Sequence, residues 1–274
     1  MPIIKCNDID INYIKKGEGE PLVLIQGTNT KLQAWNFQIE FFMEKMMVIA
    51  FDNRGAGKSS RPNYPYTMEM YLDDTISLLK ALQIQDKIHL CGYSLGGKIA
   101  LNLALKYPVK IKTLLLIATE PYTDPMKPKQ TIEFYYQFDK MSFEEKMNTV
   151  FRLVYTRDFI KKLKQNQNLY NLLKKDMNIL VYTEDPPRLN DYINQFKAIE
   201  NNDIRNSIHK ITHPTLIIVG DKDVNTPSEG SRFMHEKIAN SKLIILENLK
   251  HGLLLEQPEK LNEIMWSFLK DYIG

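Results

Sequence analysis

Residues 92–96 read Gly-Tyr-Ser-Leu-Gly, a Gly-x-Ser-x-Gly pattern. A short apolar stretch precedes them, and an apolar stretch of helical length follows. A serine at a sharp turn between a strand and a helix projects into open space, where its hydroxyl can attack a carbonyl carbon. Glycines at the outer positions tolerate the close backbone approach of such a turn. The pattern therefore predicts a nucleophile elbow made by Gly92, Ser94 and Gly96.

A serine hydroxyl is a weak nucleophile until a base accepts its proton, so a histidine must reach Ser94. His251 follows an apolar stretch at 242–246, in a loop that could carry it over the strand ends. In an open α/β sheet the carboxyl ends of the strands are where ligands bind. His251 is therefore the favoured base. The other histidines lie in a strand, beside the start of a strand or in a helix: His89, His209, His213 and His235.

An acid must orient this histidine, and by the same reasoning it should follow the preceding strand, at 214–219. Asp221 and Asp223 both lie in that loop. Either aspartate gives the chain order Ser, Asp, His, which is typical of one serine-hydrolase scaffold and differs from the orders of the others.

The elements that must position these residues alternate along the chain. Near-continuous apolar strands are typical of a sheet covered on both faces, and strand–helix alternation predicts a parallel, doubly wound sheet. We predict an antiparallel pair and then six further strands: 3–6, 9–15, 21–25, 46–51, 87–91, 111–117, 214–219 and 242–246. The predicted helices are 68–82, 95–106, 228–239 and 259–272, with another around 35–45.

One long segment, residues 120–208, breaks this alternation with amphipathic helical patterns such as 143–155 and 158–173. We predict a hydrolytic core formed by 1–119 and 209–274, with 120–208 inserted after the sixth strand as a helical cap. The cap is rich in aromatic residues that indicate an apolar substrate cavity: Tyr122, Phe134, Tyr135, Tyr136, Phe138, Phe143, Phe151, Tyr155, Phe159, Tyr170, Tyr182, Tyr192 and Phe196.

The chain resembles the α/β-hydrolase superfamily, in particular its lidded serine esterases and enol-lactonases. Besides the elbow, residues 52–59 are similar to the D-x-R-G-x-G-x-S loop of that family. Gly220-x-x-Asp223 resembles its acid loop, and His251 followed by Glu256-Gln-Pro resembles its histidine loop. In that pattern the acid is the fourth residue counted from the glycine, so the resemblance favours Asp223 over Asp221.

The resemblance also implies an oxyanion hole of two backbone amides. The amide of Leu95, directly after the nucleophile, supplies one donor. The other belongs to the loop after the third strand, residues 26–30 (Gln-Gly-Thr-Asn-Thr), where the matching position is Thr28. This chain has Gln26 where relatives commonly have histidine. Asp52 and Arg54 are expected to hold their own loop by hydrogen bonds.

These features predict a serine hydrolase that cleaves small to medium apolar carboxylic esters through an acyl-enzyme on Ser94. An enol-lactonase, a carbon–carbon bond hydrolase, a thioesterase, a perhydrolase and a proline iminopeptidase remain open on the same triad. For the iminopeptidase, the candidate amine-binding carboxylates are Glu133, Glu144, Glu145 and Glu200. The non-enzymatic alternative is a hydrolase-like receptor that binds a small ligand. Ser94 argues against haloalkane dehalogenase or epoxide hydrolase activity, because the enzymes of this fold that have those activities use an aspartate nucleophile.

Composition limits the other classes. The chain has 36 basic and 33 acidic residues, a formal charge of +3, so no nucleic-acid partner is expected. No stretch is long and apolar enough for a membrane helix, and there is no signal-peptide pattern. Cys6 and Cys91 fit no metal-binding pattern and are expected in the core. We expect a cytoplasmic monomer or homodimer that acts on a small-molecule ester without metal or cofactor.

Overall fold

A computed structural model describes all residues except 125, 167–169 and 171–186. One sheet of eight strands has the order β1-β2-β4-β3-β5-β6-β7-β8. Strands β1 and β2 form an antiparallel hairpin, β2 pairs antiparallel with β4, and all other pairs are parallel. The strands are β1 (Ile3–Cys6), β2 (Ile9–Lys16), β3 (Pro21–Ile25), β4 (Met47–Phe51), β5 (Ile88–Tyr93), β6 (Ile111–Ile117), β7 (Thr215–Gly220) and β8 (Ser241–Leu246). The predicted mostly parallel sheet is therefore confirmed.

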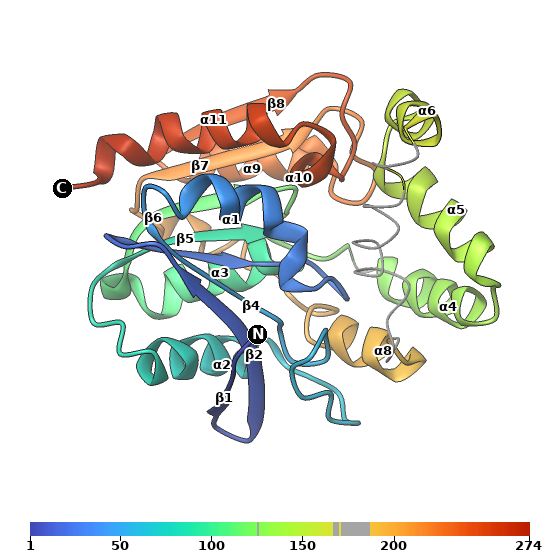
Figure 1. Ribbon diagram of the computed structural model, residues 1–274, viewed down its shortest axis with the longest axis horizontal. Helices are drawn as coiled ribbons and strands as arrows, with labels where there is room; N and C mark the ends of the chain where they lie inside the picture. The colour runs from blue at the N-terminus through green and yellow to red at the C-terminus, as the bar shows by residue number, and fades with distance from the viewer. Residues whose placement is uncertain (125, 167–169, 171–186) are drawn as a thin grey trace.

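Helices cover both faces of the sheet (Figure 1). On one face, α2 (Met68–Ala81), α3 (Leu95–Lys106) and α9 (Ser228–Lys237) contribute to a core that includes Leu78 and Ile99. On the other face, α1 (Asn36–Phe42) and α11 (Pro258–Leu269) contribute to a second core that includes Phe42 and Met265. Burial on both faces explains why all residues of β3 and β5 are buried and why β3 is apolar along its length.

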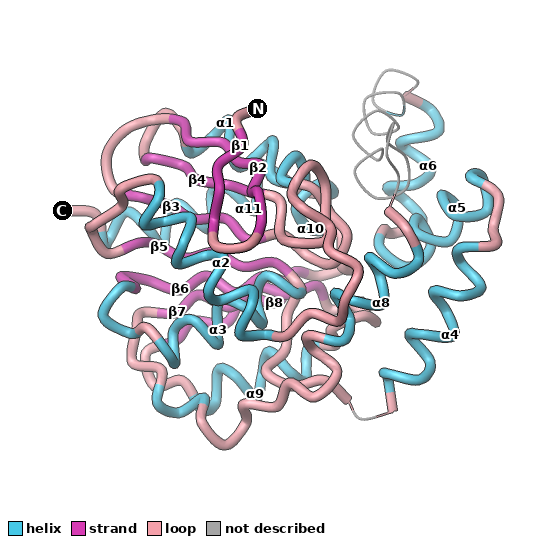
Figure 2. Tube along the Cα trace, turned by 90° about the horizontal axis from the view of Figure 1, so that it is seen from below, coloured by secondary structure: helices cyan, strands magenta, loops and turns pink. Residues whose placement is uncertain are grey.

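The segment after β6 forms helices, as predicted. They are α4 (Lys127–Asp139), α5 (Phe143–Val154), α6 (Arg157–Gln165) and α8 (Leu189–Lys197). These helices lie together beyond one end of the sheet (Figure 2). A capping box between Ser142 and Glu145 starts α5. The predicted helix 158–173 ends at Gln165 in its described part, and most of its remainder lies outside the described residues.

Two boundaries differ from prediction for physical reasons. β5 continues through Gly92 and Tyr93, which pair with β6, so the turn begins only at Ser94. The helix expected around 35–45 divides into a 3₁₀ turn, Leu32–Trp35, and the short α1. The carboxylate of Asp52 accepts the Leu32 amide at 2.7 Å and so fixes where the turn begins. A short helix, α10 (Leu253–Glu256), was not predicted.

The strand register brings the chemistry-bearing loops to one edge of the sheet. Ile25 of β3 lies beside Gly92 of β5, and Tyr93 beside Ile117 of β6. β7 and β8 also end together, where Gly220 pairs with Leu246. The loops that follow β3, β5, β7 and β8 therefore emerge side by side. The division into a core and a cap at residues 119/120 and 208/209 stays a prediction.

Candidate active site

The backbone of Ser94 has the conformation of a nucleophile elbow. Its φ is 55° and its ψ is −116°, a region that a non-glycine residue rarely adopts. A Cβ at Gly92 would lie 2.2 Å from the Gly96 carbonyl oxygen, and one at Gly96 would lie 2.0 Å from the Ile25 carbonyl oxygen. Both positions therefore exclude side chains. Backbone strain of this kind is retained where the surrounding structure enforces it, often at functional sites.

The elbow is fixed from several directions. The Ser94 amide donates to the Ile117 carbonyl at 3.0 Å, and Thr119 Oγ1 donates to the Ser94 carbonyl at 2.8 Å. Leu95 begins α3 directly after the serine. The first amides of a helix have no acceptor within the helix and lie at the positive end of its dipole. The Leu95 amide is thus suited to hold a developing negative charge.

Asp223, and not Asp221, contacts His251. The distance between Asp223 Oδ2 and His251 Nδ1 is 2.7 Å, and both residues are buried. Asp221 is exposed, and its carboxylate accepts the Leu249 amide at 3.2 Å. Burial alone would raise the pKa of Asp223, but attraction to His251 and its hydrogen bonds hold that pKa below its usual value. The ionised carboxylate is therefore favoured beside the imidazole.

Thr226 is a further partner of this pair that the sequence did not reveal. Its hydroxyl donates to Asp223 Oδ2 at 2.9 Å and lies 3.3 Å from His251 Nδ1. The amides of Asn225 and Thr226 donate to the other carboxylate oxygen, at 2.8 and 3.0 Å. The loop after β7 therefore orients the carboxylate through bonds that do not involve the histidine.

Ser94, His251, Leu95 and Thr28 line one cavity of about 350 Å³, so the structure brings these predicted residues from three loops to one space. Helices α4 and α8 and the end of α5 supply most of its aromatic wall. Its aromatic lining residues besides Tyr93 are Phe37, Phe134, Tyr135, Phe138, Tyr155, Tyr192 and Phe196. The predicted apolar cavity beneath the inserted helices is present.

Other predicted aromatic residues have different places. Phe151 and Leu163 belong to a separate small core of the inserted helices, which Tyr155 joins to the cavity and against which Phe143 and Phe159 pack. Tyr136 is exposed, and Tyr182 lies outside the described residues. The buried indole of Trp35 packs edge-on against Tyr93, with ring centroids 6.3 Å apart, as a core residue.

Two charged residues, Lys98 and Glu120, also line the cavity. Both are buried, and the Lys98 ammonium lies 3.7 Å from a Glu120 carboxylate oxygen. Lys98 Nζ also donates to the backbone carbonyls of Glu120 and Tyr122. The pair leaves this wall of the cavity with no net charge and anchors the start of the inserted segment to α3.

The segment after β6 is also bonded to the loop that carries His251. The Gly252 amide donates to the Val154 carbonyl at 2.9 Å, and Lys250 Nζ donates to the Arg152 carbonyl at 2.6 Å. The carboxylate of Glu256 accepts from both the amide and the hydroxyl of Thr156. The end of α5 therefore holds the histidine loop on both sides of His251.

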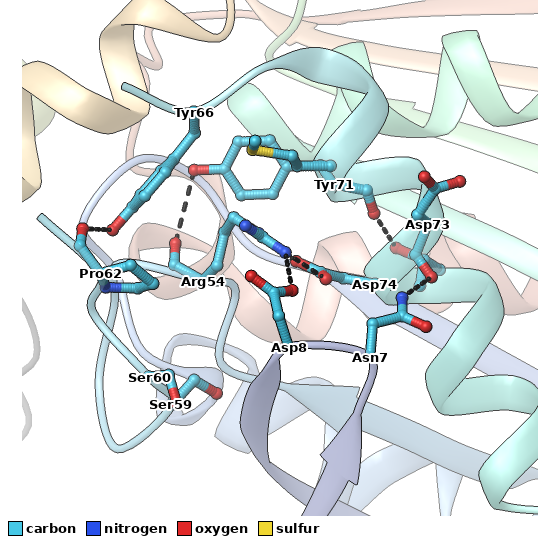
Figure 3. Close-up of polar contacts among 12 residues, drawn as sticks. Asn7, Asp8, Arg54, Ser59, Ser60, Pro62, Tyr66, Tyr71, Asp73 and Asp74 are labelled. Carbon is cyan, nitrogen blue, oxygen red and sulfur yellow. Dashed lines mark hydrogen bonds and ion pairs between the residues drawn. The ribbon is translucent and has the colours of Figure 1, made fainter. Parts of the chain in front are cut away.

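The Asp-Arg loop, residues 52–59, acts as a support. Asp52 accepts from Asn12 Nδ2 at 2.6 Å and from the Lys58 amide at 2.9 Å. Figure 3 shows the Arg54 side chain between α2 and the β1–β2 turn, where it contacts Asp74 at 2.5 Å and Asp8 at 3.2 Å. Asp52 therefore holds its own loop, as expected, whereas the ion pairs of Arg54 leave the loop and tie it to α2 and the β1–β2 turn.

The described residues contain no cluster of histidine, cysteine and acidic side chains suited to a metal ion. Within the same part of the chain, no helix has the length and apolarity to cross a membrane. Cys6 and Cys91 are buried, and each is a free thiol. Of the other histidines, His89 lies in β5, where its ring contacts Thr113 and Glu20.

Known proteins resemble this chain over nearly its whole length. The 3-oxoadipate enol-lactonase 2 of Acinetobacter baylyi is 26% identical over 272 residues, covering 98% of this chain and 96% of that enzyme. Epoxide hydrolase 4 of Mus musculus is 29% identical, covering 98% of this chain and 78% of that protein. An esterase from Exiguobacterium antarcticum has a similar structure, with a TM-score of 0.83, 25% identity and 98% of each chain covered.

The alpha/beta hydrolase fold family matches residues 20–258, which include the elbow, the acid loop and the histidine loop. The sheet order and the helices inserted after β6 agree with the resemblance inferred from the sequence. The chain therefore belongs to the alpha/beta hydrolase fold family and is a hydrolase of that fold.

Proposed function

We propose that the protein is a serine hydrolase that cleaves small to medium apolar carboxylic esters through an acyl-enzyme on Ser94. The observation that carries the proposal is the shared cavity. Ser94 sits on a strained elbow in the same cavity as His251, whose Nδ1 lies 2.7 Å from Asp223. A nucleophile, a base and an orienting acid in this arrangement support acyl transfer.

The proposed reaction has two halves, acylation of Ser94 and then its deacylation, and both use the same groups. Asp223 accepts a hydrogen bond from the Nδ1–H of His251, which fixes the tautomer in which Nε2 is the basic nitrogen that takes the Ser94 proton. The Leu95 and Thr28 amides hold the oxyanion of the tetrahedral intermediate. His251 then gives its proton to the departing alcohol. In the second half it activates a water that releases the acid from Ser94.

The serine nucleophile makes epoxide hydrolysis unsuitable despite the 29% identity to epoxide hydrolase 4. Attack of a serine hydroxyl on an epoxide carbon would leave an alkyl ether on Ser94. Water with a histidine base does not cleave such an ether, whereas it does cleave an acyl ester. An epoxide would therefore trap the enzyme after one event.

Lactone hydrolysis is a second candidate, favoured by the 26% identity to an enol-lactonase over nearly the whole chain. A lactone is an internal ester, so the same groups suffice. Proline iminopeptidase activity has less support. Glu133 and Glu144 are exposed, Glu145 caps α5, and Glu200 pairs with Lys197 at 2.7 Å. None of these four carboxylates lines the cavity formed by the described residues.

The test is a substrate panel with one preparation of wild-type protein and Ser94→Ala. The panel contains p-nitrophenyl esters of increasing acyl length, simple lactones, acyl thioesters and a prolyl amide. We expect multiple turnovers on short and medium esters, and a loss of several orders of magnitude in Ser94→Ala. A fluorophosphonate should label Ser94, identified by peptide mass spectrometry. Unchanged turnover in Ser94→Ala would refute the proposal, and a single stoichiometric binding event without turnover would favour a receptor.

A further inference from the structure

Gln195 of α8 has a fully buried side chain, although it belongs to the segment inserted after β6. Its Nε2 donates to Asn29 Oδ1 at 2.6 Å and to the Gly55 carbonyl at 2.8 Å. Its Oε1 accepts from the Asn29 amide at 3.0 Å. Both hydrogens and the carbonyl oxygen of this side-chain amide are therefore used, and they join three segments that are distant in sequence.

The contact falls on the oxyanion loop, residues 26–30. Asn29 has a φ of 53°, a left-handed conformation that costs energy for most residues and is tolerated best by glycine, asparagine and aspartate. The Thr30 amide donates to the Gly27 carbonyl at 3.4 Å, which closes a turn around Thr28 and Asn29. Gln195 bonds both the backbone and the side chain of Asn29, so it stabilises this conformation directly.

These bonds also decide which amide is available to a substrate. The Asn29 amide is committed to Gln195, and the Thr30 amide to Gly27. Thr28 is half-buried and lines the cavity together with Ser94. Of the Thr28, Asn29 and Thr30 amides, these bonds therefore leave that of Thr28 available to an oxyanion.

The remaining anchors of the loop come from the Asp-Arg loop. Asn53 Nδ2 donates to the Gln26 carbonyl at 3.2 Å, and Asp52 accepts the Leu32 amide at 2.7 Å. These bonds hold the two ends of the segment, while Gln195 holds its middle. Since Gln195 also bonds Gly55, it fixes the oxyanion loop relative to its support.

Helix α8, which carries Gln195, is itself bonded to the core at other residues. The buried carboxylate of Asp191 lies 3.1 Å from Arg61, and the Asn194 carbonyl accepts the Tyr66 amide at 3.2 Å. Phe196, the residue after Gln195, packs into the core that includes Leu78 and Ile99, and it also lines the cavity. One helix therefore shapes the substrate cavity and bonds the oxyanion loop.

We propose that Gln195 is a positioning residue for the oxyanion hole, one that acts through Asn29 to aim the Thr28 amide at the developing oxyanion. The role rests on the proposed serine-hydrolase function. Donors stabilise a transition state only when they are held in place before the reaction, and small misplacements reduce the rate strongly. The inserted segment thereby contributes to transition-state stabilisation as well as to the substrate cavity.

Gln195→Met and Gln195→Glu test the role. Methionine keeps the volume and loses all three bonds, whereas glutamate keeps an acceptor for the Asn29 amide and loses both donors. Removing an oxyanion donor outright costs about 10²–10³ in kcat. We expect these variants to lose about tenfold to a hundredfold in kcat on a short p-nitrophenyl ester, with KM changed less than about threefold. Affinity for a trifluoromethyl ketone, which forms a tetrahedral adduct with Ser94, should fall by a similar factor.

Asn190→Ala is the matched control on the same helix. It removes a bond from Asn190 Nδ2 to Asn63 Oδ1 of 2.9 Å that also joins α8 to the core but does not reach the oxyanion loop. Its kcat should equal that of the wild type. Asn29→Gly is a second variant, because glycine adopts the positive φ freely and keeps the amide. The loss of kcat in Asn29→Gly should not add to the loss of kcat in Gln195→Met when the two are combined in a double-mutant cycle.

Two results would overturn the inference while the proposed function stands. One is an active wild type whose folded Gln195 variants keep kcat and ketone affinity within about twofold. The other is a fall in thermal stability with unchanged ketone affinity, which indicates a purely structural role. A wild type that neither hydrolyses the esters nor reacts with a fluorophosphonate would refute the proposed function, and the positioning role with it.

Discussion

The hydroxyl of Tyr93 donates to the carbonyl oxygen of His251 at 3.0 Å, and the two ring centroids lie 5.0 Å apart. Tyr93 is the residue directly before Ser94, so the elbow is bonded to the backbone of the proposed base. Burial raises the pKa of Tyr93 well above its usual value, which keeps its hydroxyl a neutral donor. One side chain thus links the nucleophile elbow directly to the backbone of the proposed base.

Tyr93→Phe should loosen this link while it retains the ring packing against His251. The carbonyl of His251 also accepts the Leu253 amide at 2.9 Å, so it keeps one partner. We expect the free energy of unfolding to fall by about 0.5–1.5 kcal/mol, the net value of one hydrogen bond. kcat should fall several-fold at constant KM. Urea unfolding and ester kinetics measure the two effects, and unchanged kcat would show that the bond does not position His251.

Asp223→Asn should reduce kcat by about 10³–10⁴, because an amide cannot stabilise the imidazolium and favours the wrong tautomer of His251. Asp221→Asn is the matched control in the same loop and should stay within about threefold of the wild type. Equal losses in the two variants would contradict the assignment of the acid. A loss in Asp221→Asn alone would transfer the role to that residue.

Asp223→Asn should also reveal a pH dependence of stability. The folded-state pKa of Asp223 lies below its usual value, so the folded state binds this proton less tightly than the unfolded chain does. Its stabilising contribution is therefore complete above the unfolded pKa of about 3.9 and is lost as pH falls through the lower folded pKa. The difference in unfolding free energy between the wild type and Asp223→Asn should shrink below about pH 4.

Local sequence signals predicted the fold and the proposed triad because their physical causes are local. Burial on both faces makes β3 continuously apolar, and the close approach of Gly96 to Ile25 requires glycine. The pattern of the acid loop favoured Asp223, and the structure brings that residue to His251.

The supporting contacts had no such signal. Gln195 and Asn29 are 166 residues apart, and a glutamine in an amphipathic helix resembles a solvent-facing residue. Thr226 lies three residues after Asp223, yet only the folded loop turns its hydroxyl toward both the acid and the base. The residues of the proposed site could therefore be selected from their types and order, whereas the contacts that orient them depend on tertiary structure.

Glu256→Gln should change stability in a pH-dependent manner. Burial raises the pKa of Glu256, although hydrogen bonds from Thr156 oppose the shift. A raised folded pKa means that the folded state holds the proton more tightly, so stability falls as pH rises from the unfolded pKa of about 4.3 through the folded one. Glutamine removes this loss. Relative to the wild type, the variant should therefore gain stability between about pH 4 and pH 7.

Glu259→Gln provides the control for Glu256→Gln, since Glu259 is an exposed residue in the first turn of α11. It measures, at pH 4 and pH 7, what replacing an exposed glutamate by glutamine does to the free energy of unfolding. If Glu256→Gln shows the same difference from the wild type at both pH values, the carboxylate of Glu256 does not titrate differently in the folded state.

Phe138→Ala should lengthen the acyl chain that the protein prefers. Phe138 of α4 is 4% exposed, lines the cavity and packs against Phe134 and Tyr192, with ring centroids 5.5 and 6.0 Å away. Removing the ring enlarges the apolar space within reach of an ester bound at Ser94. In the p-nitrophenyl ester series, the maximum of kcat/KM should move to longer acyl chains.

Phe151→Ala separates this effect from loss of stability. Phe151 is equally buried, at 4% exposure, but belongs to the small core of the inserted helices and does not line the cavity of the described structure. Truncation of a buried phenylalanine costs about 3–5 kcal/mol, so both variants should unfold more easily. Only Phe138→Ala should change the acyl-length profile. The same shift in both variants would mean that general loosening of the inserted helices, and not the space at Phe138, sets chain-length preference.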